Sequence, residues 1–268
     1  MKNYSLLFLA FLFFATPAFA EEPQDEVYEL SLLKDGLISG AGLLLFGTSL
    51  LLDHFIAQAP GSEVALDINN VNAFDRWAAT GYNPTLDKAC DVLAFGLLAM
   101  PSLLFIKKDI GEILTIGVMY SEAILLATGV KEIVKNSIIR YRPYNYFDNP
   151  HEDHFAEDSA NSFFSGHTTY VFTSAAFLTK VFSDYNPDSP WKYAVGIGSY
   201  SVAATVGILR IASGNHFPSD VLLGAASGTL IGFFVPFLHK INEDESVALA
   251  ISSDGNQGMS FSVKYTFQ

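Results

Sequence analysis

The sequence predicts an all-α protein: a bundle of six helices embedded in a membrane, followed by a C-terminal β-hairpin. Six apolar segments recur along the chain, hydrophobic residues make up 50% of it, and charged residues make up only 16%. A typical soluble domain is about 25% charged. The hairpin is predicted because apolar and polar residues alternate near the C-terminus instead of recurring at helical spacing.

Charge and cysteine content exclude several classes of protein. The formal net charge is -13, and a nucleic-acid partner requires basic surfaces, so no nucleic acid is expected. The single cysteine, Cys90, excludes an intrachain disulfide and a thiolate metal cluster. We interpret Cys90 as a small buried hydrophobic residue.

Residues 1–20 have the pattern of a secretory signal peptide. Lys2 gives a positive start, residues 6–14 are apolar, and Ala18-Phe19-Ala20 forms a cleavage motif before Glu21. An uncleaved anchor helix is the alternative. Either interpretation directs the chain to a membrane or across one.

The six apolar segments follow in order, with Pro101 predicted to kink the second and Pro143 to stop the third. The polar connection 58–90 is long enough to carry function or short helices. Uninterrupted apolar runs of about 15 to 18 residues are short for a bilayer, which leaves a soluble bundle open. The segments are 36–52, 92–106, 113–130, 165–182, 193–209 and 218–239.

Residues 244–268 are expected to form the hairpin. Met259, Phe261 and Val263 alternate with serines and a lysine, and the apolar residues 247, 249 and 251 alternate likewise before a Gly-containing turn. Two strands cannot close a barrel, so we expect the hairpin to pack on the domain or on a partner. The predicted division is a signal at 1–20, a helical domain at 21–243 and the hairpin.

Three polar clusters lie at the ends of apolar segments: residues 135–143, 165–167 and 210–220. Cations at such ends are costly unless they are paired or functional. Lys135, Arg142 and Arg210 would together hold a phosphate-like anion, because guanidinium groups match tetrahedral oxyanions. Ser165 and Gly166 open a helix, where free N–H groups favour the same anion.

Two histidines in these clusters suggest phosphoryl-transfer chemistry. His216 precedes a helix start and has Asp220 four residues later to orient its imidazole, so it suits a nucleophile on phosphorus. His167 lacks a nearby carboxylate in the sequence and suits a general acid for the leaving oxygen. The cations would stabilise the transferring group without a metal or another cofactor.

Lys135-x6-Arg142-Pro143, Ser165-Gly166-His167 and Arg210-x5-His216-x3-Asp220 together resemble the three-part signature of the type 2 phosphatidic acid phosphatase superfamily. That superfamily includes bacterial non-specific acid phosphatases and vanadium haloperoxidases. The resemblance covers residues 135–224. It implies that His216 forms the phosphohistidine, Asp220 orients it and His167 protonates the leaving group, while the remaining members hold the phosphate: Lys135, Arg142, Ser165, Gly166 and Arg210.

The chain departs from the family pattern at two positions. Phe164 replaces the usual proline before Ser-Gly-His, and Leu209 replaces the usual serine before the arginine. Neither position supplies a side chain to the chemistry above, so we expect activity with an altered substrate fit. The predicted function is metal-independent hydrolysis of a lipid phosphate or isoprenyl diphosphate. A soluble secreted acid phosphatase and a vanadate-dependent haloperoxidase are the alternatives.

Lysines at the ends opposite the clusters favour an inner-membrane protein with its site at the periplasmic helix ends: Lys107, Lys108, Lys180, Lys192 and Lys240. If the signal is cleaved and all six segments span the membrane, the site would instead face the cytoplasm. Whether residues 36–52 cross the membrane therefore stays open. The oligomeric state and the identity of the lipid also stay open. The acidic loop 144–161 borders the site in this interpretation. Its two histidines, His151 and His154, are assigned no metal.

Overall fold

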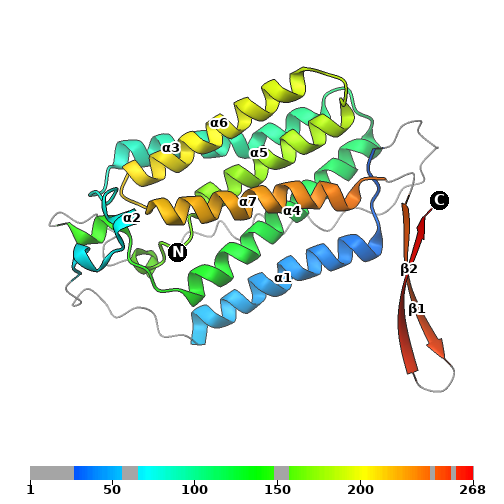
Figure 1. The fold of residues 1–268 in the computed structure, drawn as a ribbon, viewed down its shortest axis with the longest axis horizontal. Helices are drawn as coiled ribbons and strands as arrows, with labels where there is room; N and C mark the ends of the chain where they lie inside the picture. The colour runs from blue at the N-terminus through cyan, green and yellow to red at the C-terminus, as the bar shows by residue number, and fades with distance from the viewer. Residues whose placement is uncertain (1–26, 56–65, 148–156, 242–244, 255–257, 268) are drawn as a thin grey trace.

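Six long helices form the molecule in a computed structural model that describes residues 27–55, 66–147, 157–241, 245–254 and 258–267 (Figure 1). The predicted signal and residues 148–156 of the acidic loop, including His151 and His154, lie outside these residues. The helices are α1 (Leu32–Phe55), α2 (Ala73–Arg76), α3 (Pro84–Ala99), α4 (Ile110–Ser137), α5 (Gly166–Tyr185), α6 (Trp191–Ala212) and α7 (Pro218–His239).

The helices run side by side along the long axis of the molecule, with α1 against α4 at one edge (Figure 1). Helix α5 packs on α3, α4, α6 and α7. Five helices are long and apolar enough to cross a membrane: α1, α3 with its 3-10 extension Met100–Phe105, α4, α6 and α7. Their outer faces expose large apolar side chains such as Leu44, Phe95 and Ile197, as expected for a protein embedded in lipid.

Helix α5 is too polar to meet the same criterion because its core positions carry hydroxyl groups. Thr169, Thr173 and Ser174 are fully buried, and each hydroxyl donates to the carbonyl oxygen four residues earlier at 2.8 to 2.9 Å. These bonds satisfy the hydroxyls inside the bundle. The other helices therefore shield a polar central helix from the surroundings.

Glycines on one face of α7 let it approach α5 closely. A Cβ on Gly224 would stand 2.7 Å from the Ser165 carbonyl oxygen, and a Cβ on Gly228 would overlap the Thr169 carbonyl oxygen. This four-residue spacing of small residues allows backbone-to-backbone packing between helices in membranes. The start of α7 is thereby held against the start of α5.

Two segment boundaries differ from the sequence prediction. Helix α4 ends at Ser137, six residues before Pro143, and the intervening residues are extended, with Arg140 paired to Asn161 in an isolated β-bridge. The first apolar segment is one continuous helix of 24 residues, so it is not re-entrant. At Pro101 the chain changes from α-helix to 3-10 helix, which agrees with the predicted kink.

The connection before α3 is shorter than predicted, because α3 begins at Pro84, eight residues before the predicted segment 92–106. Its described part, residues 66–83, carries a 3-10 turn at Ile68–Asn70 and helix α2, so the expected short helices are present. Cys90 is fully buried in an apolar cluster with Leu97, Val171 and Val206. At the C-terminus, strands β1 (Glu245–Asp254) and β2 (Gly258–Phe267) pair antiparallel. A folded hairpin that packs on the helices or on a partner stays a prediction.

Candidate active site

The three polar clusters meet at one end of the bundle, where α4 and α6 end and α3, α5 and α7 begin (Figure 1). A cavity of about 510 Å³ lies there. Six of the eight predicted site residues line it: Lys135, Arg142, Gly166, His167, Arg210 and His216. Ser165 and Asp220 are fully buried and do not line the cavity.

His216 is held with one ring nitrogen inward and the other towards the cationic side of the cavity. Its side chain is 2% exposed, and Nδ1 lies 2.8 Å from the carbonyl oxygen of Ser162. A carbonyl oxygen only accepts hydrogen bonds, so Nδ1 carries the proton and Nε2 keeps its lone pair. Nε2 lies 3.5 Å from Nη1 of Arg142. The arrangement leaves Nε2 free to act as a nucleophile.

Burial lowers the pKa of His216 well below its ordinary value, and the neighbouring Arg142 and Arg210 lower it further. Both effects disfavour the imidazolium. The ring is therefore neutral at physiological pH, which is the form that a nucleophilic nitrogen requires.

Asp220 does not make the predicted direct hydrogen bond to His216. Its Oδ2 stands 3.7 Å from Nδ1, while the same oxygen accepts from the Ser162 hydroxyl at 2.6 Å and the Phe217 amide at 2.8 Å. The hydrogen bond from the Phe217 amide caps the start of α7. Because the Ser162 carbonyl fixes the histidine, Asp220 orients His216 through Ser162.

Arg140 is a buried anchor that the sequence analysis missed. It pairs with Asp220 and with Asp75, whose Oδ2 lies 2.6 Å from Nη2. Both carboxylates have no exposed side-chain surface. Ser219 completes the network by donating its amide to Asp75 at 2.9 Å. Arg140 thus fastens the connection before α3 to the start of α7.

The carboxyl of Asp75 is ionised in this network. Burial alone would raise its pKa, but hydrogen bonds from Ser219 and Asn72, with Arg140 beside them, hold the pKa below its ordinary value. Its contribution to stability is therefore present above the unfolded-state pKa and is lost as pH falls through the lower folded-state pKa.

Arg210 is oriented by a carboxylate from α3. Its Nη1 pairs with Asp87, which also accepts from Asn215 at 2.9 Å and from the Tyr82 hydroxyl at 2.8 Å. Asn83 places Asp87 in the first turn of α3 by capping that helix. The Nε of Arg210 is buried without a hydrogen-bond partner among the residues that the structure describes, and a bound oxyanion would satisfy this donor.

The turn before His216 requires glycine at position 214. Gly214 has φ +76°, and a Cβ there would stand 2.6 Å from the Gly81 carbonyl oxygen. The Tyr144 amide donates to the Gly214 carbonyl at 3.1 Å. Residues 81 and 144, from two separate connections, therefore fix the loop that carries His216.

His167 has a carboxylate partner that the sequence did not reveal. Its Nε2 lies 3.0 Å from Oδ1 of Asp91 on α3, and both side chains are partly exposed to the cavity, at 40% and 45%. Burial, and then the cations Arg210 and Lys135, nevertheless lower the pKa of His167 to about 3, so the ring is neutral while the cavity holds no anion. The pair suits a group that gives and takes a proton at the cavity surface.

Ser165 does not bring its hydroxyl to the cavity, contrary to the prediction that it binds phosphate. Its Oγ caps α5 by accepting from Thr168, and its amide donates to the Asp220 carbonyl at 3.1 Å. Gly166 does line the cavity, and a Cβ there would stand 2.8 Å from Cδ of Lys131. Glycine thus admits a lysine chain beside the start of α5.

The cavity is electropositive overall. Four cationic side chains line it against the two carboxylates of Asp87 and Asp91. The four are Lys131, Lys135, Arg142 and Arg210. A net positive pocket at a helix start, with a neutral histidine inside, is suited to a phosphate group and a nucleophilic attack on it. Apolar side chains, including Phe95 and Leu98, also line the cavity.

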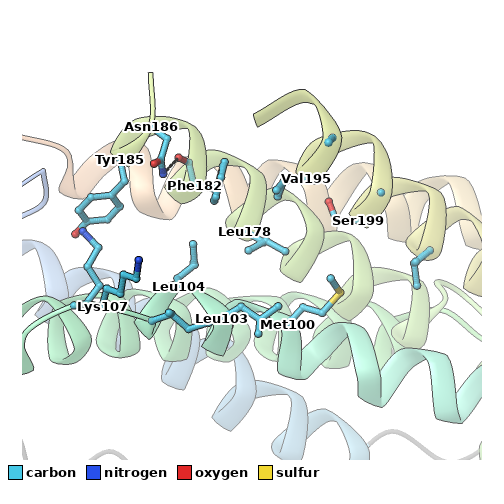
Figure 2. Close-up of a pocket in the computed structure, with 15 residues that line it drawn as sticks. Met100, Leu103, Leu104, Lys107, Leu178, Phe182, Tyr185, Asn186, Val195 and Ser199 are labelled. Carbon is cyan, nitrogen blue, oxygen red and sulfur yellow. Dashed lines mark hydrogen bonds between the residues drawn. The ribbon is translucent and has the colours of Figure 1, made fainter. Parts of the chain in front are cut away.

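A second cavity, of about 730 Å³, lies at the other end of the bundle (Figure 2). Leu104, Leu178 and Val195 give it an apolar lining, and Lys107 stands at one side. Among the described residues that line it there is no histidine. It therefore lacks the histidine nucleophile that the first cavity offers.

The chain is similar to known phosphatases. Residues 116–243 match the family model described as the PAP2 superfamily. A lipid A 1-phosphatase of Porphyromonas gingivalis is 45% identical over 74 residues, which are 28% of this chain and 15% of that protein. A probable diacylglycerol pyrophosphate phosphatase 1 of Schizosaccharomyces pombe is 28% identical over 159 residues, covering 53% of this chain and 56% of that protein.

The chain thus spans less than two thirds of either curated relative. Among solved structures, a transmembrane PAP2 type phosphatidylglycerolphosphate phosphatase from Bacillus subtilis is 23% identical. The match covers 74% of this chain and 95% of that one, with a TM-score of 0.45.

Proposed function

Because residues 116–243 match the family model of the PAP2 superfamily, we propose that this protein is a membrane-embedded phosphatase acting on a lipid phosphate or isoprenyl diphosphate. The observation that carries the proposal is the neutral His216, whose Nε2 keeps its lone pair beside Arg142. The relatives act on phosphorylated lipids, according to their names, and this chemistry matches the cationic cavity.

In the first step, Nε2 of His216 attacks phosphorus and the bond to the lipid oxygen breaks. His167 gives its proton to the departing oxygen. The negative charge of the bound phosphate offsets the cations that lower the pKa of His167, and Asp91 holds the ring in place. Arg142, Arg210 and Lys135 neutralise the charge on the transferring oxygens. The products are a phosphohistidine and a lipid alcohol, or a lipid monophosphate when the substrate is a diphosphate.

In the second step, water attacks the phosphohistidine. His167, now neutral, accepts a proton from the water, and the bond between phosphorus and Nε2 breaks to release inorganic phosphate. The Ser162 carbonyl keeps the proton on Nδ1 throughout. Cationic side chains supply the electrostatic stabilisation, so the proposal includes no metal and no cofactor in this site.

A lipid tail has an apolar path from the cavity. Phe95 and Leu98 line it, and Phe95 is 74% exposed on the outer face of α3. The headgroup would reach His216 while the tail lies against α3 in the bilayer. This exposed apolar surface also argues against the soluble acid phosphatase alternative.

The test is phosphate release by purified protein in detergent from lipid phosphates, an isoprenyl diphosphate and soluble phosphate esters. We expect kcat/KM for one lipid class to exceed that for soluble esters at least tenfold, with turnover retained in excess chelator. Vanadate should inhibit without supporting halide oxidation. A preference for soluble esters, or activity abolished by chelator, would contradict the proposal.

We further propose that 21–243 is the helical phosphatase domain, that 244–268 is a separate hairpin, and that the site faces the periplasm from the inner membrane. Lys107 and Lys192 lie at the opposite helix ends, which supports the orientation. Lys180 and Lys240 lie there too, but both pair with Asp184. If α1 crosses the membrane, this orientation places residue 27 in the cytoplasm. Cleavage of a secretory signal would leave residue 27 on the periplasmic side, so this orientation is incompatible with a cleaved signal.

Cysteine labelling in intact cells tests the orientation. Asn70 lies at the site end and Asp188 in the turn between α5 and α6, and both are exposed. An impermeant maleimide should label Asn70→Cys and spare Asp188→Cys. The wild type is the control because Cys90 is fully buried. The reverse pattern would put the site in the cytoplasm.

A further inference from the structure

A second cluster of ionisable side chains lies at the end of the bundle away from the phosphate cavity. Asp35 in the first turn of α1, Glu122 on α4 and His239 at the end of α7 bring one ligand atom each within 4.8 Å of one another. His239 Nε2 lies 2.8 Å from Asp35 Oδ1 and 3.3 Å from Glu122 Oε2. Three helices far apart in sequence therefore meet at a nitrogen and two carboxylate oxygens.

The imidazole of His239 is oriented as a metal ligand. Its Nδ1 lies 2.8 Å from the Val235 carbonyl oxygen, so Nδ1 carries a proton and donates it. A backbone acceptor on the second ring nitrogen is the usual partner of a metal-bound histidine. Nε2 therefore points between the two carboxylates.

Glu122 supplies a buried oxygen without a hydrogen bond. Its side chain is 1% exposed, its Oε1 accepts from the Ser39 hydroxyl at 3.1 Å, and its Oε2 has no hydrogen-bond partner in the described part of the chain. Such an oxygen is costly to bury unless something neutralises it. Oε2 faces His239, inside the cluster.

The net charge of the cluster differs between two states, one with a proton on Nε2 of His239 and one with a divalent cation bound there. With a proton there, the cluster holds two carboxylates and one imidazolium, a buried net charge of minus one. With a divalent cation and a neutral imidazole, the charges cancel. A low-dielectric interior favours the balanced state. The 21% exposed side chain of Asp35 leaves a path to solvent.

We propose that Asp35, Glu122 and His239 bind a divalent transition-metal cation of the zinc type, which fastens α1 to α4 and α7. One imidazole nitrogen and two carboxylate oxygens are a donor set that zinc accepts. Ligand atoms about 2.0 to 2.2 Å from zinc in a tetrahedron stand roughly 3.4 Å apart. The observed separations of 2.8 and 3.3 Å need only a small opening.

The proposed cation site is structural and separate from catalysis. His216 lies two residues before the start of α7 and His239 at its end, and the 22 residues of α7 span about 33 Å at the helical rise of 1.5 Å per residue. Removing the cation should loosen α1 without removing any group from the phosphate cavity. Chelator should therefore lower the Tm while leaving phosphatase turnover intact below that temperature.

The test is zinc binding to the full chain in detergent, after stripping with chelator, by isothermal titration and by elemental analysis of dialysed protein. Wild type should bind one zinc per chain and gain several degrees in Tm. His239→Gln and Glu122→Gln should lose the binding. His167→Gln, which removes a histidine at the other end, should bind zinc as wild type does.

Asp35→Asn keeps the inference testable if the buried variants fail to fold, because Asp35 is partly exposed and lies in the first turn of α1. It should weaken zinc binding at least about tenfold. Absence of saturable zinc binding to wild type, or equal binding by Asp35→Asn, would overturn the proposal. The cluster would then be a protonated histidine paired with two carboxylates.

Discussion

At the scale of residues, the proposed nucleophile depends on a backbone carbonyl for its tautomer. Asp220 acts one step further out, through its 2.6 Å bond from the Ser162 hydroxyl. Asp220 also accepts a hydrogen bond from the Phe217 amide at the start of α7 and pairs with Arg140. The four-residue spacing of His216 and Asp220 predicted that they lie near each other but not the residue that mediates between them.

Ser162→Ala and Asp220→Asn test this relay as a double-mutant cycle. Each should lower kcat with little change in KM, because each loosens His216 without touching the phosphate cations. Together they should cost clearly less than the sum of the single effects, since both act through one hydrogen bond. Steady-state kinetics on the best lipid substrate measures the coupling. Additive losses would mean that Asp220 acts on His216 independently of Ser162.

The sequence predicted the cationic residues and the histidines because they occur close together within short motifs. It could not predict Asp87 and Asp91, which come from a helix more than 40 residues before Lys135. Nor could it show that Arg140 pairs with the carboxylates of Asp75 and Asp220. Residue spacing shows which side chains share a helix turn, whereas the approach of separate helices depends on packing.

At the scale of elements, the contact between α5 and α7 positions the chemistry. His167 starts one helix and His216 immediately precedes the other, so their separation depends on how closely the two helices pack. The glycines of α7 were part of an apolar segment in the sequence, with no sign of their partner. The structure shows their role, which is to let the backbone of α5 approach: the carbonyl oxygens of Ser165 and Thr169 lie against them.

Gly228→Ala should destabilise the protein by about 1 to 3 kcal/mol, because the new Cβ overlaps the Thr169 carbonyl oxygen and forces the helices apart. Unfolding in detergent micelles measures the change. Gly198→Ala is the matched control: it lies on α6 with open space around it, and it should be neutral or stabilising by up to about 1 kcal/mol. Equal effects of the two substitutions would contradict close packing at Gly228.

At the scale of the whole molecule, the two ends of the bundle have different roles. One end gathers a phosphate cavity from five helix ends, and the other holds the Asp35, Glu122 and His239 cluster. Six apolar segments and low charge predicted the helical membrane bundle correctly. The first segment was ambiguous in the sequence because its length is near the limit for a span, and packing along α4 makes it a full helix.

The most direct measurement is trapping of a phosphoenzyme from a substrate with a radiolabelled phosphate, quenched during turnover in excess chelator. The account predicts label on wild-type protein that is stable to alkali and labile to acid, as a phosphohistidine is. His216→Ala should carry no label while its Tm stays near that of wild type. Label on a folded His216→Ala variant, or turnover by it near the wild-type rate, would contradict the assignment of His216 as the nucleophile.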